Sequence, residues 1–243
     1  MLYKISDNLY YSKHRYMYLE PSIGYIKGKN YSITIDSGNC EEQVQKFYKD
    51  LKDNNLAVPS FTILTHYHWD HSFGASYMDT KLITSKATSN HLKSLKERDL
   101  KLDNLQNLVD EGIDIQFNID MMKKVYQKSK NDIKIKLPDI VKEYDFSLNL
   151  GGIIVDFYNN DNSHSDDSLL IYVRKDKILF IGDSHTKSYM TKPMSFNKKK
   201  LRDYIDFIYK IDFKYAIPGH GNIYSKSDLI NELEIEYNKI LEE

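Results

Sequence analysis

The chain contains the stretch Phe61-Thr62-Ile63-Leu64-Thr65-His66-Tyr67-His68-Trp69-Asp70-His71, in which a strand pattern runs directly into a dense group of polar side chains. The first five residues are β-branched or apolar, which is typical of a buried strand. The last six contain three imidazoles and one carboxylate, although the whole chain has only eight histidines. Imidazole nitrogen and carboxylate oxygen suit zinc and other divalent metals. We therefore expect a metal site on the loop that leaves this strand.

Four ligands from one loop would be crowded around a single ion. His66 and His68 are two residues apart, so in an extended loop their side chains point the same way. Asp70 and His71 follow after a bend and can point elsewhere. This spacing favours two adjacent metals that share one loop, each completed by residues from later in the chain.

Three later segments offer such residues. His164 lies in a polar cluster, residues 162–166, between two apolar runs. The run from Ile178 ends in Asp183, and a short strand pattern from Ala216 ends in the glycine-flanked His220. Each candidate follows a strand or turn signal, as ligands that converge at one edge of a sheet would.

Together, the candidate residues resemble the motif set of the metallo-β-lactamase-fold superfamily. The resemblance extends from about Tyr31 to Gly221, and five separated elements occur in the expected order: Asp36, His66-x-His68-x-Asp70-His71, His164, Asp183 and His220. The resemblance implies a four-layer α/β/β/α sandwich. Two mixed sheets would face each other, helices would cover their outer faces, and the metals would lie at one edge.

The resemblance also implies a role for each residue. Three imidazoles would bind the first metal, namely His66, His68 and His164. Three side chains would bind the second, namely Asp70, His71 and His220. Asp183 would bridge the two metals. Asp36 would lie behind them and orient a ligand, a role that the chemistry of metal sites independently favours.

One difference from some of these enzymes indicates which branch of the superfamily the chain resembles. The penicillin-hydrolysing enzymes with a cysteine ligand carry it where this chain has Asp183, and the single cysteine, Cys40, lies in no ligand motif. The complete histidine motif with a bridging aspartate is more similar to glyoxalase II, lactonases and ribonuclease Z. The oxygen-reducing diiron branch usually has Glu where this chain has His68, and a fused flavodoxin domain, and neither is present.

The expected activity is hydrolysis by a binuclear site. Two cations would hold a shared water and lower its pKa from ~15.7 toward ~7, so that a bridging hydroxide attacks the substrate. Asp70 would act as the catalytic carboxylate that accepts the proton. Zinc is the favoured metal, and iron or manganese are alternatives. A small-molecule ester, lactone or thioester is the first choice of substrate. Alternatives are a phosphodiesterase or ribonuclease, a β-lactam hydrolase, an iron-dependent oxidase of the same fold, and a binding protein on a relict site.

Composition limits the partners. The 243 residues carry a formal net charge of −1, which gives no electrostatic footprint for nucleic acid. No run approaches ~18 apolar residues, so no membrane partner is expected, and the N-terminus does not read as a signal peptide. One cysteine fits a reducing compartment, and we expect a cytoplasmic protein with a small-molecule substrate. The oligomeric state is left open.

We expect one domain, residues 1–243, with a helical insertion at about 94–144. This charged segment contains no candidate ligand, and it is either a lid over the site or an ordinary surface pair of helices. His185 either lines the pocket or lies on the surface, whereas His14 and His91 are expected at the surface. Tyr67 and Trp69 alternate with the ligands, so we expect them to point away from the metals and pack.

Overall fold

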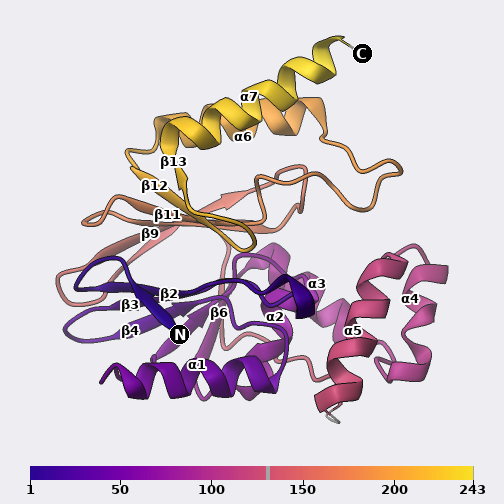
Figure 1. The fold of residues 1–243 in the computed structure, drawn as a ribbon, viewed down its shortest axis with the longest axis horizontal. Coiled ribbons are helices and arrows are strands. Elements are labelled where there is room, and N and C mark those ends of the chain that lie inside the picture. Colours follow the sequence, from indigo (N-terminus) through magenta and orange to yellow (C-terminus); the bar gives the residue numbers. More distant parts are fainter. Residues whose placement is uncertain (130–131, 243) are drawn as a thin grey trace.

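In the computed structural model, which describes residues 1–129 and 132–242, two β-sheets face each other and helices lie on their outer faces (Figure 1). The layers therefore follow the order helix, sheet, sheet, helix, which confirms the predicted α/β/β/α sandwich. Within the described residues, no helix is long and apolar enough to cross a membrane.

The first sheet contains the early strands in sequence order. Neighbouring strands are antiparallel up to β4 and parallel from β4 onward. Its strands are β1 (Leu2–Lys4), β2 (Leu9–Ser12), β3 (Ile23–Lys27), β4 (Ser32–Ile35), β5 (Phe61–Ile63), β6 (Lys81–Ser85) and β7 (Ile140–Lys142).

The second sheet contains the late strands in reverse order, from β13 at one edge to β8 at the other. Among its described strands, β11 and β12 are the only parallel neighbours. Its strands are β8 (Phe146–Asn149), β9 (Ile154–Asn160), β10 (Ser168–Val173), β11 (Ile178–Gly182), β12 (Tyr215–Pro218) and β13 (Tyr224–Ser225).

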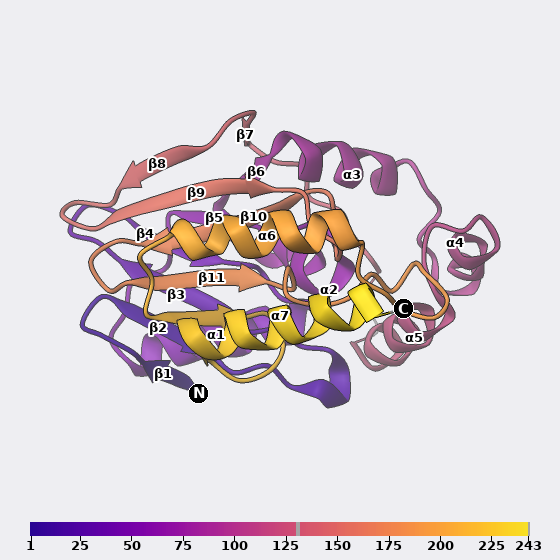
Figure 2. The same ribbon diagram turned by 90° about the horizontal axis from the view of Figure 1, so that it is seen from above.

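Helices α1 (Glu41–Asp53), α6 (Lys198–Lys210) and α7 (Lys226–Glu242) form the outer layers. In α1, Val44, Phe47 and Leu51 recur at helical spacing and are buried against the first sheet. Helices α6 and α7 lie side by side across the second sheet (Figure 2). The remaining helices are α2 (Trp69–Ser72), α3 (Lys86–Lys96), α4 (Gln106–Asp110) and α5 (Gln116–Ser129), with short 3-10 turns at Tyr16–Tyr18, Phe73–Tyr77 and Leu102–Asn104.

The main core lies between the two sheets. Ile35 and Ile63 from the first sheet belong to the same buried cluster as Phe157 and Ile171 from the second. Because these strands are apolar on the shared face, burying that face holds the two sheets together. The loops that follow β4, β5, β11 and β12 begin at the carboxyl ends of these strands.

The segment at about 94–144 differs in part from the prediction. About half of its described residues are helical, and α4 and α5 contact each other beyond the end of the sheets (Figure 2). However, Ile140–Lys142 forms strand β7 and pairs in parallel with β6. A three-residue strand two positions after Pro138 leaves too short a pattern to be predicted. Residues 130 and 131 of the expected insertion lie outside the described residues, as does residue 243. The division into one domain and an insertion stays a prediction.

Candidate metal centre

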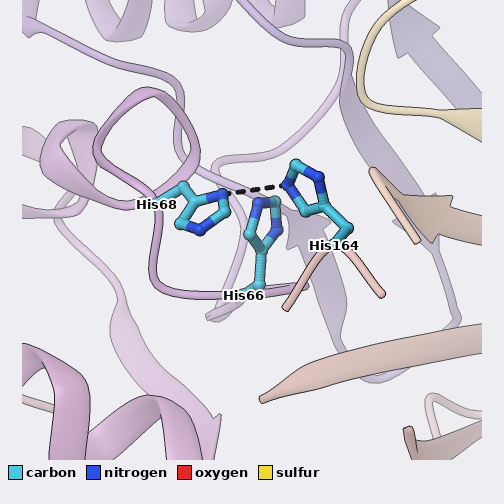
Figure 3. Close-up of side chains that lie close together, drawn as sticks. All are labelled: His66, His68 and His164. Atoms are coloured by element: carbon cyan, nitrogen blue, oxygen red, sulfur yellow. Dashed lines mark hydrogen bonds between the residues drawn. The ribbon is translucent and has the colours of Figure 1, made fainter. Parts of the chain in front are cut away.

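Three histidines from two loops converge at one edge of the sandwich. His66 and His68 lie on the loop after β5, and His164 lies on the loop between β9 and β10 (Figure 3). Their ring nitrogens all lie within 4.8 Å of one another, and His68 Nδ1 is 3.0 Å from His164 Nε2. The structure thus brings together the three imidazoles that the resemblance implies for a first metal.

A second group of possible ligands lies next to the first. Asp70 and His71 lie on the short helix α2, and His220 follows β12. The ligand atoms of these three side chains also lie within 4.8 Å of one another. His220 Nε2 is 2.8 Å from Asp70 Oδ2, and His71 Nε2 is 3.6 Å from the same oxygen.

Asp183, directly after β11, lies between the two groups. Its Oδ2 is 3.6 Å from His71 Nε2 and 3.9 Å from both His164 Nε2 and His220 Nε2. Gly219 leaves room for this carboxylate, because a Cβ there would be only 2.4 Å from Asp183 Oδ1. One carboxylate oxygen therefore faces both histidine groups, as a bridging ligand would require.

Asp36, at the end of β4, supports the centre from behind. Its Oδ2 lies 2.8 Å from His71 Nδ1, and its Oδ1 accepts a hydrogen bond from the Thr65 amide at 2.7 Å. A carboxylate can only accept, so His71 carries its proton on Nδ1 and leaves Nε2 free to bind a metal. Asp36 adopts a φ of +61°, a conformation that aspartate tolerates better than most residues.

Two threonines orient further histidines, and neither was predicted from the sequence. Thr65 Oγ1 donates to Asp36 at 2.9 Å and lies 3.1 Å from His66 Nδ1. Thr186 Oγ1 donates to the carbonyl of Asp183 at 2.9 Å and lies 2.7 Å from His164 Nδ1. Because each hydroxyl already uses its proton, it accepts the Nδ1 proton of the imidazole, which leaves Nε2 free.

The chemistry of the unpaired atoms fits a bound cation. Within the described residues, His66 Nε2, His71 Nε2 and Asp183 Oδ1 are buried and have no hydrogen-bond partner. Buried polar atoms are nearly always paired, so a cluster of unpaired polar atoms requires an explanation. Imidazole nitrogens and carboxylate oxygens that converge in this way are compatible with one or more divalent metals.

Electrostatics point in the same direction. Burial lowers the pKa of His66 and His68 well below its ordinary value, so both imidazoles are neutral, the form that binds metals. Burial alone would also lower the pKa of His71, but the carboxylates of Asp70, Asp36 and Asp183 hold that pKa well above its ordinary value. The negative potential that favours a proton on His71 would equally favour a cation at this position.

His185 and His14 are more buried than the surface positions that were considered for them. His185 is only 9% exposed, so the surface alternative for it is wrong. His14 is half-buried rather than free at the surface, because its Nδ1 accepts a hydrogen bond from the Gly221 amide and its ring lies 6.3 Å from that of His220. His91 is partly exposed and stacks on Tyr67 at 4.1 Å.

Trp69 and Cys40 belong to one apolar cluster beside the motif. Trp69 is buried and packs with Phe73 in a cluster that includes residues of α4 and α5. Cys40 belongs to the same cluster and is absent from the possible ligand groups of the described residues. Burial raises the pKa of its thiol to about 12, so the thiolate that would bind a metal is not available at neutral pH.

Comparisons with known proteins place the chain in a family. No curated protein matches it. Among solved structures, a metallo-beta-lactamase from Pontibacter korlensis is 18% identical over 98% of this chain and 99% of its own, with a TM-score of 0.64. A metallo-beta-lactamase family protein from Thermus thermophilus is 13% identical over 98% and 81%, with a TM-score of 0.66. A sec-alkyl sulfatase is 15% identical over 98% of this chain but only 41% of its own, with a TM-score of 0.70.

These similarities to solved structures show a shared fold, because the identities are too low to carry an activity across. The family model for the metallo-beta-lactamase superfamily matches residues 19–220, which include both groups of possible ligands, Asp183 and Asp36. The match does not distinguish the branch similar to glyoxalase II from the others. By its sequence and its fold, the chain belongs to the metallo-beta-lactamase superfamily.

Proposed function

We propose that the chain is a metal-dependent hydrolase with two divalent ions, zinc in the first place, and that it acts on a small-molecule ester, lactone or thioester. The position of Asp183 carries this proposal. Its carboxylate oxygen lies within 3.9 Å of histidine nitrogens from both possible ligand groups. A carboxylate shared by two sets of imidazoles suits a pair of ions better than a single one.

In this proposal His66, His68 and His164 hold one ion, and Asp70, His71 and His220 hold the other. Asp183 would be shared by both ions. When bound, the ions would lower the pKa of a water molecule toward ~7 and polarise the oxygen of the substrate. Asp36 and Thr186 keep the free nitrogens of His71 and His164 aimed at the centre.

Asp70 is the residue proposed to move the proton. Its carboxylate lies at the centre, and among the described residues a histidine lies at hydrogen-bond distance from its Oδ2 alone. The other oxygen can accept a proton from the attacking water and pass it to the leaving group. The Asp70 side chain is 12% exposed, which limits competition from bulk water.

A small substrate is favoured by charge. The net charge of −1 provides no general attraction for a polyanion such as RNA, which makes phosphodiester cleavage the second choice. β-Lactams rank third, although solved structures with the same fold include metallo-beta-lactamases. A sulfate ester is included among the substrates to be assayed, because one structural relative is a sec-alkyl sulfatase.

The proposed function is tested with metal-free protein reloaded with zinc, iron or manganese. Each form is assayed on chromogenic esters, lactones, thioesters, phosphodiesters, β-lactams and a secondary alkyl sulfate. We expect hydrolysis of the first three classes, loss of activity in His164→Ala, and retention in His91→Gln, a histidine outside both groups. Activity that is confined to other classes, or that persists without metal, would contradict the proposal.

A further inference from the structure

A narrow notch lies directly beside the proposed metal centre. It is bounded by His68 and by side chains from α2, from the loop after β11, and from the helical segment between β6 and β7. The loop after β11 and α5 lie at the same end of the molecule in both ribbon views (Figures 1 and 2). The volume of the notch is about 20 Å³, which is room for one group the size of a water molecule.

The acidic wall of the notch is Asp114, just before α5. Its Oδ1 accepts hydrogen bonds from the Ile115 amide at 2.8 Å and from Asn118 Nδ2 at 2.6 Å. Within the described residues, no lysine, arginine or histidine forms an ion pair with this carboxylate, and no hydrogen bond reaches its Oδ2. Its Oδ2 is therefore available to accept a hydrogen bond from a cationic group that enters the notch.

The other walls of the notch are aliphatic and aromatic, and the aliphatic part comes from Leu95, Leu108, Ile113 and Met122. Tyr67, Trp69, Phe73 and Tyr189 line it together with His68. The Tyr189 ring lies 4.9 Å from the His68 ring, and the Tyr67 ring lies 4.8 Å from it. Aromatic faces attract cations, and a carboxylate among them adds a charged hydrogen-bond acceptor. The combination is the chemistry that recognises an ammonium group.

We propose that the notch binds a primary ammonium group of the substrate, so that the hydrolase prefers esters, thioesters or lactones that carry an amine. An ammonium group is about the size of a water molecule and matches the space available. His68 belongs both to the proposed metal centre and to the wall of the notch, which places the ammonium group beside the centre. This inference rests on the proposed function, because it specifies the substrate of the same site.

The kinetic test uses a matched pair of thioesters of N-acetylcysteamine. The β-alanyl and butyryl compounds have nearly the same shape and differ by an ammonium group in place of a methyl group. We expect a ratio of kcat/KM of at least about 10 in favour of the β-alanyl compound. Asp114→Asn keeps the shape and the helix-terminal acceptor but removes the charge. It should lower this ratio by about 10- to 100-fold, mainly through a higher KM for the β-alanyl compound.

A ratio cancels any general loss of folded or metal-loaded enzyme. Asp120→Asn serves as the matched control, because Asp120 lies on the exposed side of α5 and contacts Gln116. This variant should keep the wild-type ratio. A wild-type ratio near one that does not change in Asp114→Asn would overturn the inference, and the notch would hold an ordered water only.

A binding test does not depend on hydrolysis. Propylammonium chloride is titrated into the metal-loaded protein and followed by NMR, with 1-propanol as the uncharged control. We expect saturable shifts with propylammonium alone and at least tenfold weaker binding in Asp114→Asn. Binding without hydrolysis of any ester would support the notch and reject the proposed function. Hydrolysis without ammonium binding or preference would support the function and reject the notch.

Discussion

Replacing Asp36 with asparagine tests how the centre is oriented without touching a proposed ligand. Asparagine tolerates the same positive φ and can still accept the Thr65 amide. However, it places an NH₂ donor where Oδ2 now accepts the proton of His71 Nδ1 at 2.8 Å. Two donors then face each other, so His71 must rotate or move its proton to Nε2. Either change removes the nitrogen that faces Asp70 and Asp183.

The expected size of the effect follows from one lost orienting contact. Partners of this kind typically contribute 10- to 100-fold to metal affinity, which corresponds to about 1.4–2.8 kcal/mol. Affinity is measured by competition with a chromogenic chelator, with the two binding steps resolved. The weaker binding should appear in the step assigned to Asp70, His71 and His220. The other step should change less, because Asp36 reaches His66 only through Thr65.

Asp156→Asn is the matched control for Asp36→Asn. Asp156 is also a buried carboxylate, but it pairs with Arg174 in the second sheet, far along β9 from the loop with His164. The Asp156→Asn protein should have a lower melting temperature than the wild type and the same affinity for both metal ions. Two unchanged binding steps in Asp36→Asn, in a protein that melts like the wild type, would refute the orientation argument.

Three further outcomes are expected. Asp183→Ala should lower metal occupancy at both steps of the titration, and full occupancy of both would show that it does not bridge. Cys40→Ser should keep its metal content, and native Cys40 should resist alkylation at pH 8, because burial raises the pKa of the thiol to about 12. The hydrogen bond to Arg174 holds the pKa of Asp156 below its ordinary value of 3.8. Its stabilisation is therefore present above that value and is lost as the pH falls through the lowered pKa. Melting curves of Asp156→Asn and wild type should differ at pH 7 and converge in strong acid.

Local patterns were enough to predict most of the framework. The apolar runs at β5, β10 and β11 are continuous, because these strands are buried on both faces. Short edge strands were missed, namely β1, β7 and β13, because two or three residues carry no period. Their pairing is decided by a neighbouring strand that is distant in sequence.

Some residues of the candidate site could be predicted from the sequence, and others could not. The loop from His66 to His71 is dense enough to stand out alone, and the order of later histidines and aspartates supplied the rest. We expected His14 at the surface. Its contact with Gly221 joins residues that are far apart in the sequence, so no local pattern predicts it. Asp114 was missed because nothing near it in sequence resembles a binding motif. Its role emerges only where the helical segment folds back beside His68.

The most direct test of the central claim is the number of metal ions that the chain holds at saturation. Metal-free protein is titrated with zinc, excess metal is removed, and the ratio of zinc to protein is determined by elemental analysis together with hydrolytic rate. We predict close to two ions per chain, with activity rising as the second binds, and fewer in Asp183→Ala. Saturation at one ion per chain with full activity would contradict it, because the site would not then be binuclear.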